Sequence, residues 1–232
     1  HNVKKSIFNQ DDFFQTSSKE GKAIIAKYEK METVIPRPDV VEPKLTSVTL
    51  DTIYDNIQLP AAFIAYQAPA QNTPDAYALE FLNNILSGGT SSRLNKVIVE
   101  EKQLAVSAFS FAFSLEDPGM ALVAGIANKD VDVEELRLAL DEEINKVKTE
   151  LVSEEEFQMV KNKLENRVIS SYSTIAGIAE GLANYSVYYN NTDLINNQLS
   201  VYENITREDL MKVANKYFTQ DARVILYYLP QQ

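Results

Sequence analysis

The chain has 232 residues, 45% hydrophobic and 24% charged, which suits a globular protein with one large domain or two small ones. Its formal net charge of −11 would repel nucleic acid and anionic membrane surfaces, so neither is expected as a partner. Cysteine is absent and the only histidine is His1, native or a tag remnant, which excludes disulfides and metal sites built on thiolates or histidines.

The first predicted element is a helix over residues 16–30, capped by Thr16, Ser17 or Ser18. The segment VIPRPDVVEPK (34–44) follows, and its three prolines within eight residues stop a helix and hold the chain extended, so it is predicted to be a linker. Residues 46–54 and 57–67 are then predicted as strands, because β-branched and aromatic residues lie there between turn signals. No apolar stretch of the sequence is long enough to insert across a membrane.

The next prediction is a pair of helices joined at Gly88 and Gly89. Thr73 caps the first helix, with Pro74 at its first position, and apolar side chains recur along it at helical spacing. The glycine pair ends this helix, and at least one of the two is expected at positive φ. A hydroxyl residue among 90–92 is expected to cap the second helix, which buries Leu94, Val97 and Ile98.

The remaining elements predict a sheet with helices on it. Residues 104–114 and the stretch MALVAGIAN (120–128) flank a turn at Pro118-Gly119 and indicate a hairpin. Helices are predicted over 133–151, from Ser153, over 174–189, over 192–203 and after Thr206, and the cap pairs are Ser153 with Glu156 and Thr206 with Asp209. With a closing strand at 222–229, the fold class is α+β, a mainly antiparallel sheet covered on one face by helices.

The segment SGGTSSR (87–93) has the glycines and hydroxyls of a phosphate-binding loop. It lacks the G-x-x-x-x-G-K-[ST] pattern and follows a helix rather than a strand, so a helix stop followed by a cap is the favoured interpretation. No internal histidine can serve a serine nucleophile as base, and neither a G-x-S-x-G motif nor a calcium loop occurs. The residues alone therefore show no catalytic constellation.

Tyrosines gather in residues 172–189, where Tyr185, Tyr188 and Tyr189 end a predicted helix. Two interpretations stand. They form a wall that contacts a peptide, or they fill the interface between helix and sheet with their hydroxyls at its rim, which is the favoured alternative.

The stretch YALEFLNNILSGGTSSRLNKVIVEEKQLAVSAFSF (77–111) resembles the M16 peptidase family, which includes insulin-degrading enzyme, pitrilysin and the mitochondrial processing peptidases. The family pattern L-x-G-G-x-S-S-R-L corresponds here to Gly88, Gly89, Ser91, Ser92, Arg93 and Leu94. Four further segments match in the right order, PRPDVVEPKL (36–45), QAPAQNTPDAYAL (67–79), LVSEEEFQMVKNKLENRV (151–168) and ITREDLMKVANKYF (205–218).

The resemblance implies half of a larger protein. Family members contain two similar halves, of which the first carries an H-x-x-E-H zinc motif and the second helps to close a chamber around an unfolded peptide. This sequence resembles the second half: residues 46–232 as the C-terminal domain, 34–45 as the linker, and 1–33 as the last helix of the preceding domain. No H-x-x-E-H is present, so zinc is expected in the parent chain and no cofactor in this fragment. The implied partners are the N-terminal half, a peptide substrate and, in some bacterial members, a second M16-like subunit.

Many members supply an Arg and, seven residues later, a Tyr from the second half to hold the substrate. The family match places these positions at Val99 and Val106, neither of which can donate a hydrogen bond. The alternative is that both valines are simply core residues.

The function that the resemblance implies is the non-catalytic half of a zinc peptidase, with an inactive assembly subunit or a stand-alone peptide-binding module as alternatives. A bacterial periplasm or cell envelope is favoured as its location over the cytoplasm.

Overall fold

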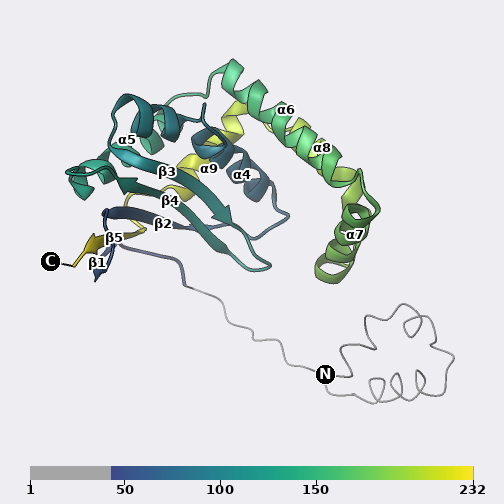
Figure 1. Cartoon of the computed structure of the whole chain (residues 1–232). Helices are drawn as coiled ribbons and strands as arrows, with labels where there is room; N and C mark the ends of the chain where they lie inside the picture. The colour runs from purple at the N-terminus through teal and green to yellow at the C-terminus, as the bar shows by residue number, and fades with distance from the viewer. Residues whose placement is uncertain (1–42, 232) are drawn as a thin grey trace, which may run out of the picture. The chain divides into compact units, whose positions relative to one another are not determined.

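A five-stranded sheet organises the part of the chain that the computed structural model describes, residues 43–231 (Figure 1). Its strands are β1 (Thr49–Asp55), β2 (Ala61–Ala68), β3 (Ala105–Phe113), β4 (Gly119–Ala127) and β5 (Val224–Pro230). Their spatial order is β1-β5-β2-β4-β3, and neighbours in it are antiparallel except for the parallel pair β1 and β5. All the strands predicted from 46 onward are confirmed, whereas the helix expected over 16–30 and the expected boundary after residue 33 lie outside the described residues.

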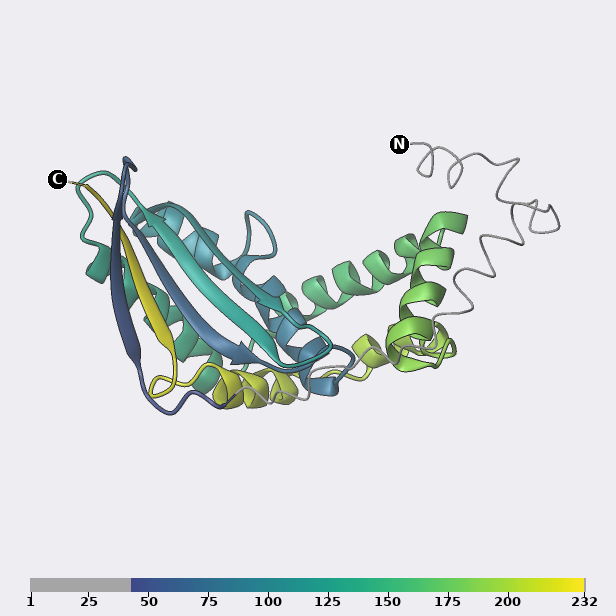
Figure 2. The ribbon, with the colours of Figure 1, turned by 90° about the horizontal axis from the view of Figure 1, so that it is seen from below.

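Helices cover one face of this sheet and then extend beyond it (Figures 1 and 2). The α-helices packed on the sheet are α4 (Pro74–Ser87), α5 (Val133–Thr149) and α9 (Arg207–Tyr217), and the π-helix η1 (Leu94–Glu101) packs against β3. α6 (Glu154–Ser171) and α7 (Ile175–Tyr189) lead away from it, and α8 (Leu194–Glu203) returns alongside α6. The predicted α+β class, with a mainly antiparallel sheet covered on one face, is confirmed.

The predicted caps explain where three of the six described α-helices begin. The Thr73 hydroxyl accepts a hydrogen bond from the Ala76 N–H at 3.2 Å, and Pro74 needs no such partner because it lacks an N–H. Ser153 with Glu156, and Thr206 with Asp209, form reciprocal capping boxes at the starts of α6 and α9. Local sequence therefore fixes these three helix starts.

The cap expected for the helix after the glycine pair is wrong. This helix, η1 (Leu94–Glu101), is wound as a π-helix, and the residue before it, Arg93, has helical backbone angles and makes no side-chain cap. The Ser92 hydroxyl instead donates to the Gly89 carbonyl at 2.5 Å and closes the loop on itself. A π-helix has i→i+5 hydrogen bonds in place of the α-helical i→i+4 bonds, so the cap rule for α-helices did not apply to this start.

The main core lies between the sheet and its helices. Ile64 and Tyr66 of β2 point into it, where they meet buried side chains such as Leu82, Leu136 and Leu210. Because successive strand residues face opposite ways, their neighbours in the sequence line the other face.

That other face is also apolar. The strand register sets Phe109, Ala124, Phe63 and Leu226 in one row across four strands, and Phe111, Leu122, Ala65 and Val224 in the next row. We call these two rows the open apolar face, because none of the described helices packs on it. Phe111 at its margin is 40% exposed.

Candidate functional site

The loop at Gly88 and Gly89 is the segment that the sequence singled out most clearly. At Gly88 a Cβ atom would lie 2.2 Å from the Asn84 carbonyl oxygen, which accepts a hydrogen bond from the Gly88 N–H at 2.8 Å. At Gly89 space is free but φ is +157°, where side chains are rarely tolerated. The expectation that one of the pair has positive φ is confirmed, and Gly88 is required for a different reason.

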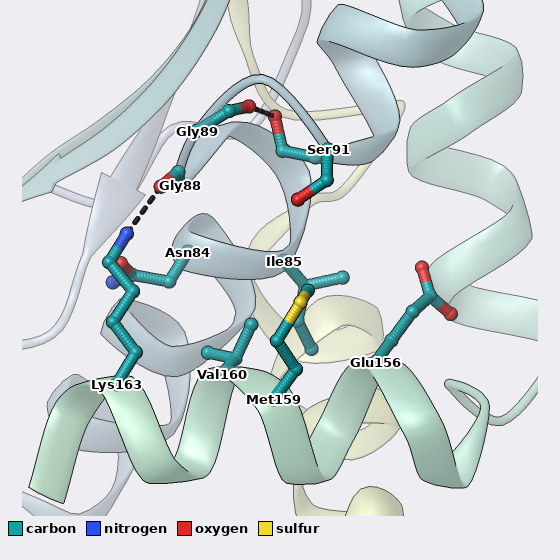
Figure 3. Close-up of a pocket in the computed structure, with 10 residues that line it drawn as sticks. Asn84, Ile85, Gly88, Gly89, Ser91, Glu156, Met159, Val160 and Lys163 are labelled. Carbon is teal, nitrogen blue, oxygen red and sulfur yellow. Dashed lines mark hydrogen bonds between the residues drawn. The ribbon is translucent and has the colours of Figure 1, made fainter.

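A small groove separates this loop from α6 (Figure 3). It measures about 100 Å³, and Met159, Val160 and Lys163 of α6 face the loop across it. The Lys163 ammonium donates to the Gly88 carbonyl, as the dashed line in Figure 3 shows. The lysine thereby ties α6 to the end of α4.

Arg93 makes the second tie between loop and α6. Its guanidinium donates to both carboxylate oxygens of Glu156, at 2.8 and 2.9 Å, and this contact is the main reason that the pKa of Glu156 is lowered. Both cations beside the loop are thus already engaged by the protein. The phosphate-loop interpretation gains no support. The contacts of Arg93 with Glu156 and of Lys163 with the Gly88 carbonyl instead hold α4, η1 and α6 together, and we call these contacts the clasp.

Val99 and Val106 lie on neighbouring elements, η1 and β3. Val99 is partly buried against the core, whereas Val106 is 49% exposed at an irregularity where the register of β3 and β4 shifts between Ala105 and Ser107. Val106 is therefore not a core residue. Their assignment as former substrate-contact positions stays a prediction.

Within residues 43–231 no group of three or more His, Cys, Asp and Glu side chains is placed to hold a metal ion. Over the same residues, no helix has the length and apolar character needed to cross a membrane.

A larger hollow runs between α4, α6, α7 and α8 and ends at β3. Two adjoining cavities of about 300 and 590 Å³ share five lining residues, namely Tyr77, Glu80, Asn184, Tyr185 and Gln198. The smaller cavity reaches Ala112 of β3 and the larger one reaches Arg167 of α6. We call the two together the tyrosine groove, after Tyr77, Tyr172, Tyr185, Tyr189 and Tyr202.

Hydrogen bonds fix the polar groups in this groove. Glu80 accepts a hydrogen bond from Arg167 at 2.5 Å and another from the hydroxyl of the buried Tyr202. Burial raises the pKa of Tyr172 and of Tyr185 to about 12, so both hydroxyls stay protonated at neutral pH. The groove thus offers aromatic faces and neutral hydroxyls.

The structure changes the interpretation of the tyrosines. Tyr185 and Tyr189 line the groove and Tyr188 is half-exposed, and α7 packs against α8 rather than on the sheet. Filling of a helix–sheet interface therefore does not describe them, and contact with a peptide stays a prediction. Sequence reasoning missed that Tyr77 and Tyr202 belong to the same wall; Tyr77 was visible only as part of the apolar periodicity of α4.

Comparison with known proteins identifies relatives of the chain. A family model described as "Peptidase M16 inactive domain" matches residues 12–164. The zinc protease PqqE of Helicobacter pylori (strain ATCC 700392 / 26695) is 29% identical over 198 residues, which are 84% of this chain and 44% of that protein. The uncharacterized zinc protease YmxG of Bacillus subtilis (strain 168) is 28% identical over 153 residues, 65% of this chain and 36% of the relative. The chain spans less than half the length of either relative.

Solved structures share the fold. A protease from Helicobacter pylori superimposes with a TM-score of 0.80 at 24% identity, over 92% of this chain and 53% of that one. The inactive peptidase domain of a putative zinc protease from Bordetella parapertussis gives a TM-score of 0.67 at 19% identity, over 78% of this chain and 95% of that domain.

Proposed function

The chain belongs to the M16 peptidase family as an inactive domain, and from that premise we propose that it is the C-terminal, non-catalytic half of a zinc metallopeptidase. The match to the inactive-domain model carries this proposal. Two observations support it: the sequence has no histidine beyond His1, and relatives named as zinc proteases are more than twice as long as the matched region. The zinc site is then in the half that precedes this one.

The first partner in this proposal is the N-terminal half of the same chain. The open apolar face supports it, because two rows of apolar side chains left in contact with water would be costly, and a partner domain that covers them stabilises both halves. A half that folds against such a face can complete a chamber without contributing to the chemistry.

The chemistry in this proposal is peptide hydrolysis. Zinc, when bound in the other half, polarises the peptide carbonyl and activates water. The residues of this chain do not take part in that step; they bind the unfolded peptide and shield it from bulk water. A bacterial periplasm or cell envelope is the proposed location, to be checked by fractionating cells that express the parent.

The test compares this chain with its full-length parent. The parent should contain one zinc by elemental analysis and, when mixed with a homologous subunit that carries the Arg and the Tyr, should cleave an unfolded peptide in a way that a chelator abolishes. The purified 232-residue chain should contain no stoichiometric zinc and cleave nothing. Tight zinc binding or hydrolysis by this chain alone would overturn the proposal.

A second candidate is an inactive subunit that assists a catalytic one. Val99 and Val106 favour this second role, because neither side chain can donate a hydrogen bond to a substrate. A parent chain that lacks a zinc motif and binds no zinc would establish this role.

A further inference from the structure

Along the outer edge of β3, the main-chain groups of one residue are already hydrogen-bonded, whereas those of nearby residues remain available for pairing. The Ser87 hydroxyl accepts a hydrogen bond from the Ser110 N–H and donates one to the Ser110 carbonyl, both at 2.8 Å. These main-chain groups therefore point away from β4, toward the outer edge of the sheet that residues 43–231 form, where β3 is the last strand. In an antiparallel pair the direction alternates, so the main chains of Ala108 and Ala112 point to the same edge.

Ala112 differs from Ala108 because it also lines the tyrosine groove. Tyr77 of α4 and Tyr185 and Tyr189 of α7 form the walls opposite this stretch of edge. An extended chain in the groove would find a main-chain donor and acceptor on one side and aromatic faces on the other.

The groove also has a net negative charge. Glu80 is paired with Arg167, so these two charges offset one another. Glu180 lines the groove as well, is exposed, and forms no ion pair with any other residue in the described range 43–231. Tyrosine faces attract cations too, and the whole chain is strongly acidic.

We propose that the tyrosine groove binds an extended, positively charged segment of the unfolded polypeptide substrate, which adds to the edge of β3 at Ala112. This inference rests on the proposed function and names the site and the class of peptide. The main-chain groups of Ala112 pair with the bound segment, as in other cases of strand addition. Glu180 and the tyrosine faces select lysine or arginine side chains.

Ser87 sets the limit of the site. By occupying the main chain of Ser110 it blocks continuous pairing along β3 and leaves Ala112, within the groove, as the place where a strand can be added. The same feature protects the sheet against aggregation through its edge.

The test measures binding of a fluorescein-labelled peptide of alternating lysine and valine by fluorescence anisotropy. Ala112→Pro removes the outward N–H without breaking a bond to β4, and should raise Kd about fivefold. Ala108→Pro is the matched control on the same edge outside the groove, and should leave Kd unchanged. Glu180→Gln should raise Kd about threefold, Glu155→Gln on the distant end of α6 should not, and added salt should weaken binding.

Peptide variants test the same pairing without altering the protein, in case Ala112→Pro fails to fold. A peptide N-methylated at alternate residues and one with glutamate in place of lysine should both bind much more weakly. Equal effects of Ala108→Pro and Ala112→Pro, or equal binding of the glutamate peptide, would overturn the proposal. If the parent cleaves peptides with zinc but this chain binds none of these probes, the groove proposal fails and the proposed function stands.

Discussion

Gly88 is required because a side chain there would clash with the Asn84 carbonyl, and Gly89 is required because its backbone has positive φ. Gly89→Val should lower the free energy of unfolding by about 1–2 kcal/mol, through strain at positive φ. Gly88→Val should cost more, about 3 kcal/mol, because its Cβ meets the Asn84 carbonyl at the end of α4. Urea unfolding measures both, with Ser91→Ala on the exposed part of the loop as the control, expected within about 0.5 kcal/mol of wild type. An unchanged midpoint in both glycine variants would contradict this account.

At the scale of elements, the clasp between η1 and α6 depends on Glu156. This carboxylate accepts from Arg93 and closes the capping box with Ser153, and these contacts lower its folded pKa. Because the folded pKa lies below the unfolded one, the stabilisation is present above the unfolded pKa, about 4.3, and is lost as pH falls through the folded pKa. Glu156→Gln should therefore lower stability by about 1 kcal/mol at neutral pH, with a difference from wild type that shrinks below pH of about 4.

Glu155→Gln is the matched control for this prediction. It removes a carboxylate from the same first turn of α6, so both variants lose a similar interaction with the helix dipole. Glu155, however, is exposed and has no part in the clasp. Urea unfolding across a pH series separates the two variants. Parallel pH curves for Glu155→Gln and Glu156→Gln would show that the clasp contributes nothing.

At the scale of the whole molecule, the predicted role of Val99 and Val106 leads to an expectation for the activity of the parent alone. If they stand where Arg and Tyr hold the substrate carbonyl, the parent lacks that donor, and such a loss costs about 3–4 kcal/mol of transition-state stabilisation. We expect the purified parent to be nearly inert on unfolded peptides and to become active when a homologous subunit with Arg and Tyr is added. Full activity from the lone parent would show that the family register at these two valines is wrong.

The sequence predicted the fold well where local signals decide structure. Three helices begin through contacts between residues no more than four apart, so these starts can be predicted from the sequence alone. The residues are Thr73 and Pro74, Ser153 and Glu156, and Thr206 and Asp209. The strands were predicted for a similar reason, since a run of β-branched and aromatic residues between turn signals indicates a strand without knowledge of which strand it pairs with. The π-helix at Leu94–Glu101 was not, because the cap rules assume ordinary α-helical spacing.

By itself the sequence determined the order of elements, the glycine stop after α4, and the lack of internal histidine that denies this chain a histidine-based metal site. Only the tertiary structure decided how distant residues meet. It brought Tyr77 and Tyr202 into one groove, joined Arg93 to Glu156, and closed the β3 edge at Ser110 with Ser87. The physical reason is that a cap or a stop acts within one turn of the chain, whereas a groove, a clasp or a sheet edge depends on which surfaces pack together.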